Sequence, residues 1–170
     1  MKKVILGILV MHMVLFGSDL LVDGNVLSTS KIVSYEDIYG MKKLEIKSVP
    51  MVCKNGDVKD KASDYDGVLL RQIIDALPIE IKERHDYNSI VITVIAADNY
   101  QVTFTYNELF NTKVGDGVLL SYAKNSKALG DKELALISAN DLKTGPRHVK
   151  NVKEIQVNMT KYEVKNDTQK

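Results

Sequence analysis

Three side chains able to bind an anion lie within four residues of one another near the end of the chain. Arg147, His148 and Lys150 follow a Gly-Pro turn signal. The apolar residues of segment 152–157 then predict a closing strand that would brace the turn. Arginine offers a planar fork of donors and lysine a mobile point charge, and both suit phosphate or carboxylate. The run is therefore a candidate anion site, and the alternative is a solvated basic turn.

Cys53 is the one cysteine of the sequence, so it has no disulfide partner within the chain. Such a residue is buried, paired between chains, or used chemically. Its ordinary explanation is a small buried hydrophobe. The sequence has no Ser-His-Asp, Cys-His or zinc-type spacing that would indicate a hydrolase or another metal site. His85 stands among charged neighbours, and we expect it in an exposed loop.

The first 18 residues have the pattern of a cleavable secretory signal peptide. Lys2 and Lys3 precede a mostly apolar run over residues 4–16, and the small residues Gly17 and Ser18 follow. The run is shorter than the ~20 residues that a membrane-spanning helix needs. The sequence thus predicts an exported protein, periplasmic or extracellular, with no stable membrane insertion after cleavage. The alternative is an uncleaved N-terminal anchor.

Length and composition favour one ordinary globular domain. The chain has 170 residues, 45% hydrophobic and 26% charged, enough for a full core without disulfides. The formal net charge of +1 does not indicate bulk nucleic-acid binding, and the absence of Trp argues against a base-stacking surface. We divide the chain into the signal peptide (1–18), a lead-in (19–30), one domain (31–158) and a polar tail (159–170).

Strand patterns outnumber helix patterns along this domain. The clearest helix is expected over residues 68–77, opened by Gly67 and ended by Pro78. Two short helices are expected to begin at Ser34 and Thr105, each with an acid three residues later. The apolar run 90–97 predicts a central strand. Further strands are expected at 31–33, 43–53, 100–104, 117–122, 133–138 and 152–157.

Two turn signals complete this interpretation. Asn55-Gly56 predicts a tight hairpin, and Pro50 before it indicates a sheet edge or a bulge. The polar segment 57–65 is expected to be a hairpin return and surface loop. The irregular order of strands and helices predicts an α+β fold with mixed β-sheets, one main helix and short inserted helices.

The order of four motifs resembles the molybdopterin-binding domain of sulfite oxidase-like oxidoreductases, in a compact single-domain form. The GVLLRQII helix segment after Tyr65-Asp66 and the ADNY strand at 97–100 are similar to two of that family's motifs. The VLLSY strand at 118–122 is similar to a third. The Gly145-Pro-Arg-His-Val-Lys150 run closely resembles the family's G-A-R-H-V-K segment. The resemblance implies a sulfite oxidase-like fold.

The resemblance also implies a chemistry: oxygen-atom or electron transfer at a molybdenum-pterin centre. It assigns Cys53 as the metal ligand, because a thiolate is a soft, charged donor suited to molybdenum. It assigns Arg147, His148 and Lys150 to the phosphate or pyran edge of molybdopterin. A small anion or small-molecule substrate and a redox partner protein would follow. Neighbours on an extended segment alternate faces, which would direct Arg147 and His148 differently.

A second hypothesis rests on where the sequence departs from the family pattern. The Cys53 segment continues as Lys54-Asn55-Gly56-Asp57 instead of an arginine-bearing loop, and Asn151 stands where the family has tryptophan. The alternative is therefore a cofactor-free relative, an exported binding or accessory module whose basic turn binds a small anion or a partner carboxylate. In a third interpretation the motif matches are accidental and the chain is an exported α+β domain of unrelated fold.

Overall fold

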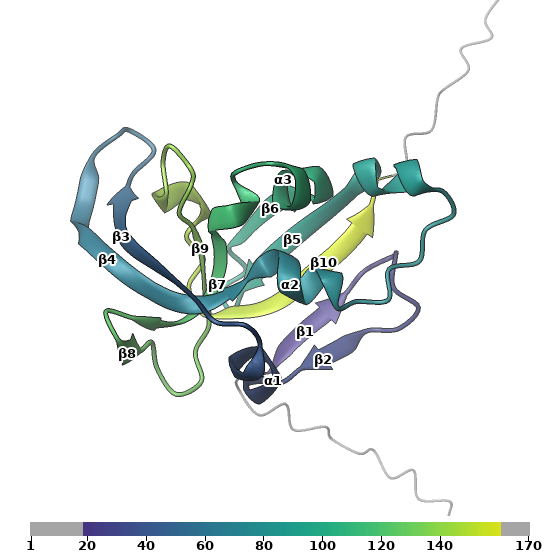
Figure 1. Cartoon of the computed structure of the whole chain (residues 1–170), viewed down its shortest axis with the longest axis horizontal. Coiled ribbons are helices and arrows are strands. Elements are labelled where there is room, and N and C mark those ends of the chain that lie inside the picture. Colours follow the sequence, from purple (N-terminus) through teal and green to yellow (C-terminus); the bar gives the residue numbers. More distant parts are fainter. Residues whose placement is uncertain (1–18, 161–170) are drawn as a thin grey trace, which may run out of the picture.

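The computed structural model of the chain describes residues 19–160. The predicted signal peptide and most of the predicted tail lie outside the described residues. The described part forms two β-sheets with short helices at their ends (Figure 1). Strands dominate, so the expected α+β class with mixed sheets is confirmed at this level.

The first sheet has the strand order β2-β1-β10-β5-β6. β1 pairs with β10 in parallel, and the other neighbours are antiparallel. Residues 20–23, expected in the lead-in, form β1 because the side chains of Leu20 and Val22 are fully buried. β5 is an interior strand, as its apolar run predicts. The strands are β1 (Leu20–Asp23), β2 (Lys31–Val33), β5 (Ile90–Ala96), β6 (Gln101–Thr105) and β10 (Val152–Met159).

The second sheet has the order β3-β4-β7-β8, and β9 also pairs with β7. The predicted Asn55-Gly56 hairpin is confirmed, because Gly56 N–H donates to the Cys53 carbonyl (2.9 Å) inside the β3–β4 turn. Pro50 lies on the edge strand β3, where the register is irregular, again as predicted. The strands are β3 (Leu44–Val52), β4 (Val58–Leu69), β7 (Val118–Lys124), β8 (Lys127–Ala128) and β9 (Ala135–Ser138).

β4 differs from the sequence prediction at both of its ends. Segment 57–65 was expected as a hairpin return and surface loop. The hairpin return is confirmed, but the segment is strand β4 from Val58 onward instead of a loop, and Tyr65 is buried. The predicted main helix begins later, because Val68 and Leu69 still pair with Leu120 and Leu119 of β7. Gly67 is therefore part of strand β4 and does not begin a helix. A Cβ on Gly67 would lie 2.2 Å from the Leu120 carbonyl oxygen.

All the helices among residues 19–160 are short, so the prediction of one main helix over residues 68–77 is wrong. Ser34 and Thr105 cap two of them as predicted, each accepting a backbone N–H three residues on. The α-helices are α1 (Tyr35–Gly40), α2 (Leu70–Asp75) and α3 (Tyr106–Asn111), and the 3-10 turns are η1 (Arg84–Ser89), η2 (Gly115–Gly117) and η3 (Gly145–Arg147). Ile73 and Ile74 of α2 belong to the same hydrophobic core cluster as Ile155 of β10.

Candidate functional site

The predicted anion-binding residues lie on a loop that is fastened at both ends. Val149 and Leu136 exchange two backbone hydrogen bonds of 2.8 and 3.0 Å, which ties the loop to β9. At the other end the buried Thr144 hydroxyl donates to the Pro50 carbonyl and accepts from Val52 N–H (3.0 Å). The loop is thus held against the β3–β4 hairpin, and its side chains have defined directions.

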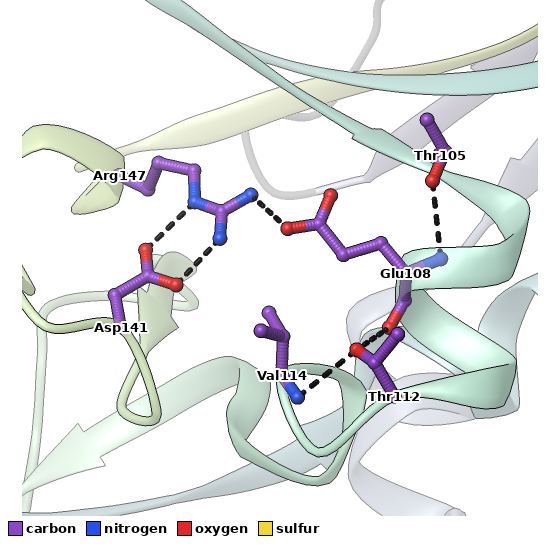
Figure 2. A network of polar contacts seen from close by, with 6 residues as sticks. All are labelled: Thr105, Glu108, Thr112, Val114, Asp141 and Arg147. Carbon is purple, nitrogen blue, oxygen red and sulfur yellow. Dashed lines mark hydrogen bonds and ion pairs between the residues drawn. The ribbon is translucent and has the colours of Figure 1, made fainter.

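Arg147 is committed to two carboxylates of the protein. Its Nε and Nη2 donate to both oxygens of Asp141 at 2.7 and 2.5 Å, and Nη1 donates to Glu108 Oε1 at 2.8 Å. Figure 2 shows the guanidinium between these two acids. The group also lies 4.3 Å from the centroid of the Phe104 ring. The hydrogen bonds to Asp141 and then to Glu108 raise the pKa of Arg147. One cation facing two anions leaves no net positive charge for a ligand.

Glu108 reaches Arg147 because the start of α3 fixes it. Its backbone N–H donates to Thr105 Oγ1 (3.1 Å), and Thr112 Oγ1 donates back to the Glu108 carbonyl (2.7 Å). The spacing predicted a capping box, but the Glu108 carboxylate turns to Arg147 instead of the Thr105 backbone. Asp141 was not singled out from the sequence. The one feature of the sequence that points to Asp141 is its position in the same loop as Arg147.

His148 points to a different part of the molecule. Its ring meets Tyr65 of β4 edge-on, with 6.3 Å between ring centroids. Desolvation by burial first, and then the charges of Lys150 and Lys124, lower the pKa of His148 to about 4. The imidazole is therefore neutral at pH 7, when one ring nitrogen donates and the other accepts. Arg147 and His148 thus have separate partners, but the extended segment expected here is wrong: Arg147 ends the 3-10 turn η3 and His148 follows it, so strand alternation is not the cause.

Two lysines complete the surroundings of His148. Lys124 of β7 places Nζ 5.7 Å from the centroid of the Tyr65 ring, and Lys150 is exposed beside the same imidazole. We call Tyr65, Lys124, His148 and Lys150 the Tyr65 cluster. Within residues 19–160, neither of these lysines has a carboxylate at ion-pair distance. The Tyr65 cluster is the basic part of this loop's surroundings. The sequence analysis did not predict Lys124 because this residue comes from a separate hairpin.

Cys53 lies outside the Tyr65 cluster. It is half-buried at the start of the β3–β4 turn. Val58, on the returning strand of this turn, and Tyr65 are seven residues apart on β4, roughly 20 Å along the strand. The loop packs directly onto this turn, since a Cβ on Gly145 would lie 2.8 Å from the Val52 carbonyl oxygen and 3.6 Å from Cys53 Cα.

The residues that the resemblance assigns to molybdopterin are therefore in three places. Cys53 is at the hairpin turn, Arg147 is between two acids, and His148 and Lys150 are at the Tyr65 cluster. In the described part of the chain, no three or more His, Cys, Asp or Glu residues are grouped so as to hold a metal ion. Arg147, which already faces two carboxylates, does not fit a role in holding the pterin.

Comparison with known proteins gives a fold and no family. No family model matches the sequence, and no curated protein matches it. Among solved structures, the chain is similar to the crystal structure of the sulfane dehydrogenase SoxCD from Paracoccus pantotrophus, with a TM-score of 0.61 and 15% identity. The match covers 88% of this chain and 40% of that one. It supports the sulfite oxidase-like resemblance at the level of the fold alone.

The described residues also bear on the membrane prediction. Between residues 19 and 160 there is no helix with the length and apolar character needed to cross a bilayer. The predicted signal peptide lies before this range. Export remains a prediction from the sequence.

Proposed function

We propose that this chain is a cofactor-free relative of the sulfite oxidase-like fold that binds a small oxyanion at the Tyr65 cluster, as an exported binding or accessory module. The observation that carries the proposal is the position of Lys124 and Lys150 near His148, two cations with no carboxylate at ion-pair distance in the described part of the chain. The third basic residue of the predicted site, Arg147, is satisfied within the protein.

The donors of the cluster suit a compact anion such as sulfate, phosphate or a carboxylate. Each lysine ammonium has three donors on a flexible stem, and the neutral imidazole of His148 has one. An anion between the lysines would relieve the repulsion that helps to lower the pKa of His148. Binding is therefore coupled to proton uptake by His148, and affinity should rise as the pH falls from 7 toward 5.

Isothermal titration calorimetry at constant ionic strength tests the site with sodium sulfate and sodium phosphate. In each of Lys124→Ala and Lys150→Ala, affinity should fall about tenfold, the loss of one charge-assisted contact. Lys82→Ala, which removes an exposed lysine elsewhere, is the matched control. The proposal is overturned if the unmodified protein binds neither anion at about 10 mM, or if both cluster variants bind as tightly as the control.

A molybdopterin-dependent oxidoreductase is the second candidate, favoured by the fold likeness to a sulfane dehydrogenase and by the half-buried Cys53. When bound, molybdopterin would supply oxygen-atom or electron transfer. Expression of the full-length precursor in a host that makes this cofactor separates the two candidates. We expect purified protein without molybdenum or pterin. Stoichiometric molybdenum that disappears in Cys53→Ser would establish the oxidoreductase and refute the cofactor-free proposal.

A further inference from the structure

A second candidate site lies between η1 and α3. Residues of both elements line an open hollow of about 690 Å³, and no residue of the Tyr65 cluster lines it. Its volume lies in the range of roughly 300–1,000 Å³ that small-molecule sites occupy. Because η1 precedes β5 and α3 follows β6, the hollow sits on adjacent strands of the first sheet, whereas Tyr65 and Lys124 belong to the second.

One side of the hollow is an aromatic wall. Tyr87 of η1 stacks on Tyr106 of α3 with 4.5 Å between ring centroids, and Tyr106 stacks in turn on Phe110 at 4.2 Å. The two tyrosines line the hollow, and stacking on both faces of Tyr106 fixes the wall in place. Neither tyrosine hydroxyl has a hydrogen-bond partner among residues 19–160. The wall therefore offers one flat apolar face, that of Tyr87, and the polar ends of both tyrosines.

The other feature is a chain of three amides. Asn111 Nδ2 donates to Asn107 Oδ1 at 2.6 Å, and Asn107 Nδ2 donates to Asn88 Oδ1 at 2.7 Å. All three residues line the hollow and link α3 to η1. Each amide has two donors and an oxygen with two acceptor positions, so the chain leaves donors and acceptors of both kinds unused. These groups are held in place before any ligand arrives.

The charged residues of the hollow balance one another. Glu83 and Arg84 both line it, and Glu83 Oε2 lies 3.3 Å from Nδ1 of the exposed His85. The hollow thus lacks the excess of positive charge found at the Tyr65 cluster. A phosphate-bearing ligand would gain little there, whereas a neutral polar ligand would not be opposed by an unpaired charge.

We propose that this hollow binds a neutral saccharide. A pyranose ring has an apolar face of C–H groups that can lie on the second face of Tyr87, which has no ring stacked on it among the described residues and carries negative charge density. Its hydroxyls both donate and accept, which matches the unused groups of the amide chain. Aromatic surface and polar groups of both kinds thus meet at one neutral site. The inference is independent of the anion site.

Nuclear magnetic resonance titration of ¹⁵N-labelled protein, made from the full-length precursor, tests the inference. The probes are cellotriose, maltotriose and N,N′,N″-triacetylchitotriose, each up to about 10 mM, a concentration that detects dissociation constants in the millimolar range. At least one probe should shift backbone signals of segments 83–88 and 106–111 in a saturable way. No saturable shift with any of the three overturns the proposal.

Asn107→Ala is the decisive variant because it removes the middle of the amide chain. Alanine is the best helix former, so α3 should remain intact. Binding of the responsive trisaccharide should weaken at least tenfold, while Lys59→Ala on β4, an exposed control in the second sheet, should bind as the unmodified protein does. Equal affinities in Asn107→Ala and the control would refute a site at the amide chain. Sulfate binding at the Tyr65 cluster should be unaffected in both variants.

Discussion

Arg147 and Lys150 are three residues apart and carry the same charge, but their surroundings differ. Arg147 lies between the carboxylates of Asp141 and Glu108, whereas Lys150 shares its surroundings with Lys124 and a neutral His148. The first is part of a network that joins α3 to the loop (Figure 2), and the second has no carboxylate at ion-pair distance in the described part of the chain. A basic run is thus not one site, because partners from distant segments decide which of its charges remain available.

The largest effect should follow the removal of Arg147. Arg147→Met would leave Asp141 and Glu108, 11% and 27% exposed, facing each other without a cation. We expect the free energy of unfolding to fall by about 2–3 kcal/mol, less than for a fully buried ion pair because the network is partly solvated. Urea unfolding measures it. Under native conditions sulfate affinity should not change, and a large loss of affinity would place Arg147 in the anion site after all.

A smaller effect, at the other end of the run, should depend on pH. The pKa of His148 in the folded protein is about 4, below its ordinary 6.5. As the pH falls, His148 therefore becomes protonated in the unfolded chain before it does so in the folded protein. The contribution of neutral His148 to the free energy of unfolding is fully present above pH 6.5 and is lost as the pH falls toward 4. Between pH 7.5 and pH 5 we expect a loss of about 2 kcal/mol from this group.

His148→Gln should remove that part of the pH dependence, and His85→Gln, at an exposed histidine, serves as the matched control. Urea unfolding at the two pH values provides the comparison. An unchanged pH profile in His148→Gln would show that His148 is solvated, and would weaken the contrast with Arg147.

The smallest effect concerns the helix start that orients Glu108. Thr105→Ala removes the hydroxyl that accepts Glu108 N–H, which should cost about 1 kcal/mol of stability. Ser34→Ala is the matched variant at α1, where the acid Asp37 returns to the Ser34 backbone and completes the capping box. If Glu108 is held by both Thr105 and Arg147, Thr105→Ala and Arg147→Met should be non-additive in a double-mutant cycle. Full additivity would mean that the cap and the network are independent.

Local patterns predicted most of the elements but not their partners. Ser34, Thr105 and Asn55-Gly56 act through atoms a few residues away, and these predictions are confirmed. Gly67 was assigned to a helix because the apolar spacing after it is helical. Only its contact with β7 shows that Val68 and Leu69 belong to a strand.

The candidate site was predictable only in part for the same reason. Glu108 is far from Arg147 in the sequence, and Asp141 is one of several polar residues in the loop before it. No local sequence pattern therefore connects the three residues. Lys124 reaches His148 through the pairing of β4 with β7, where Tyr65 lies opposite Lys124. The sequence indicated a basic run, and tertiary pairing determined how that run is divided.

The position of β10 has a consequence for folding order. β10 is the last strand among residues 19–160, but it lies in the middle of the first sheet, between β1 and β5 (Figure 1). The β3–β4 and β5–β6 hairpins need only local contacts and can form early, whereas the first sheet has no centre until residues 152–159 are present. Pairing between β1 and β10 joins the two ends of the domain, the kind of non-local contact that slows folding. Trimming the chain before Val152 would therefore remove the centre of the sheet, and a nascent chain would remain only partly folded until its last strand was made.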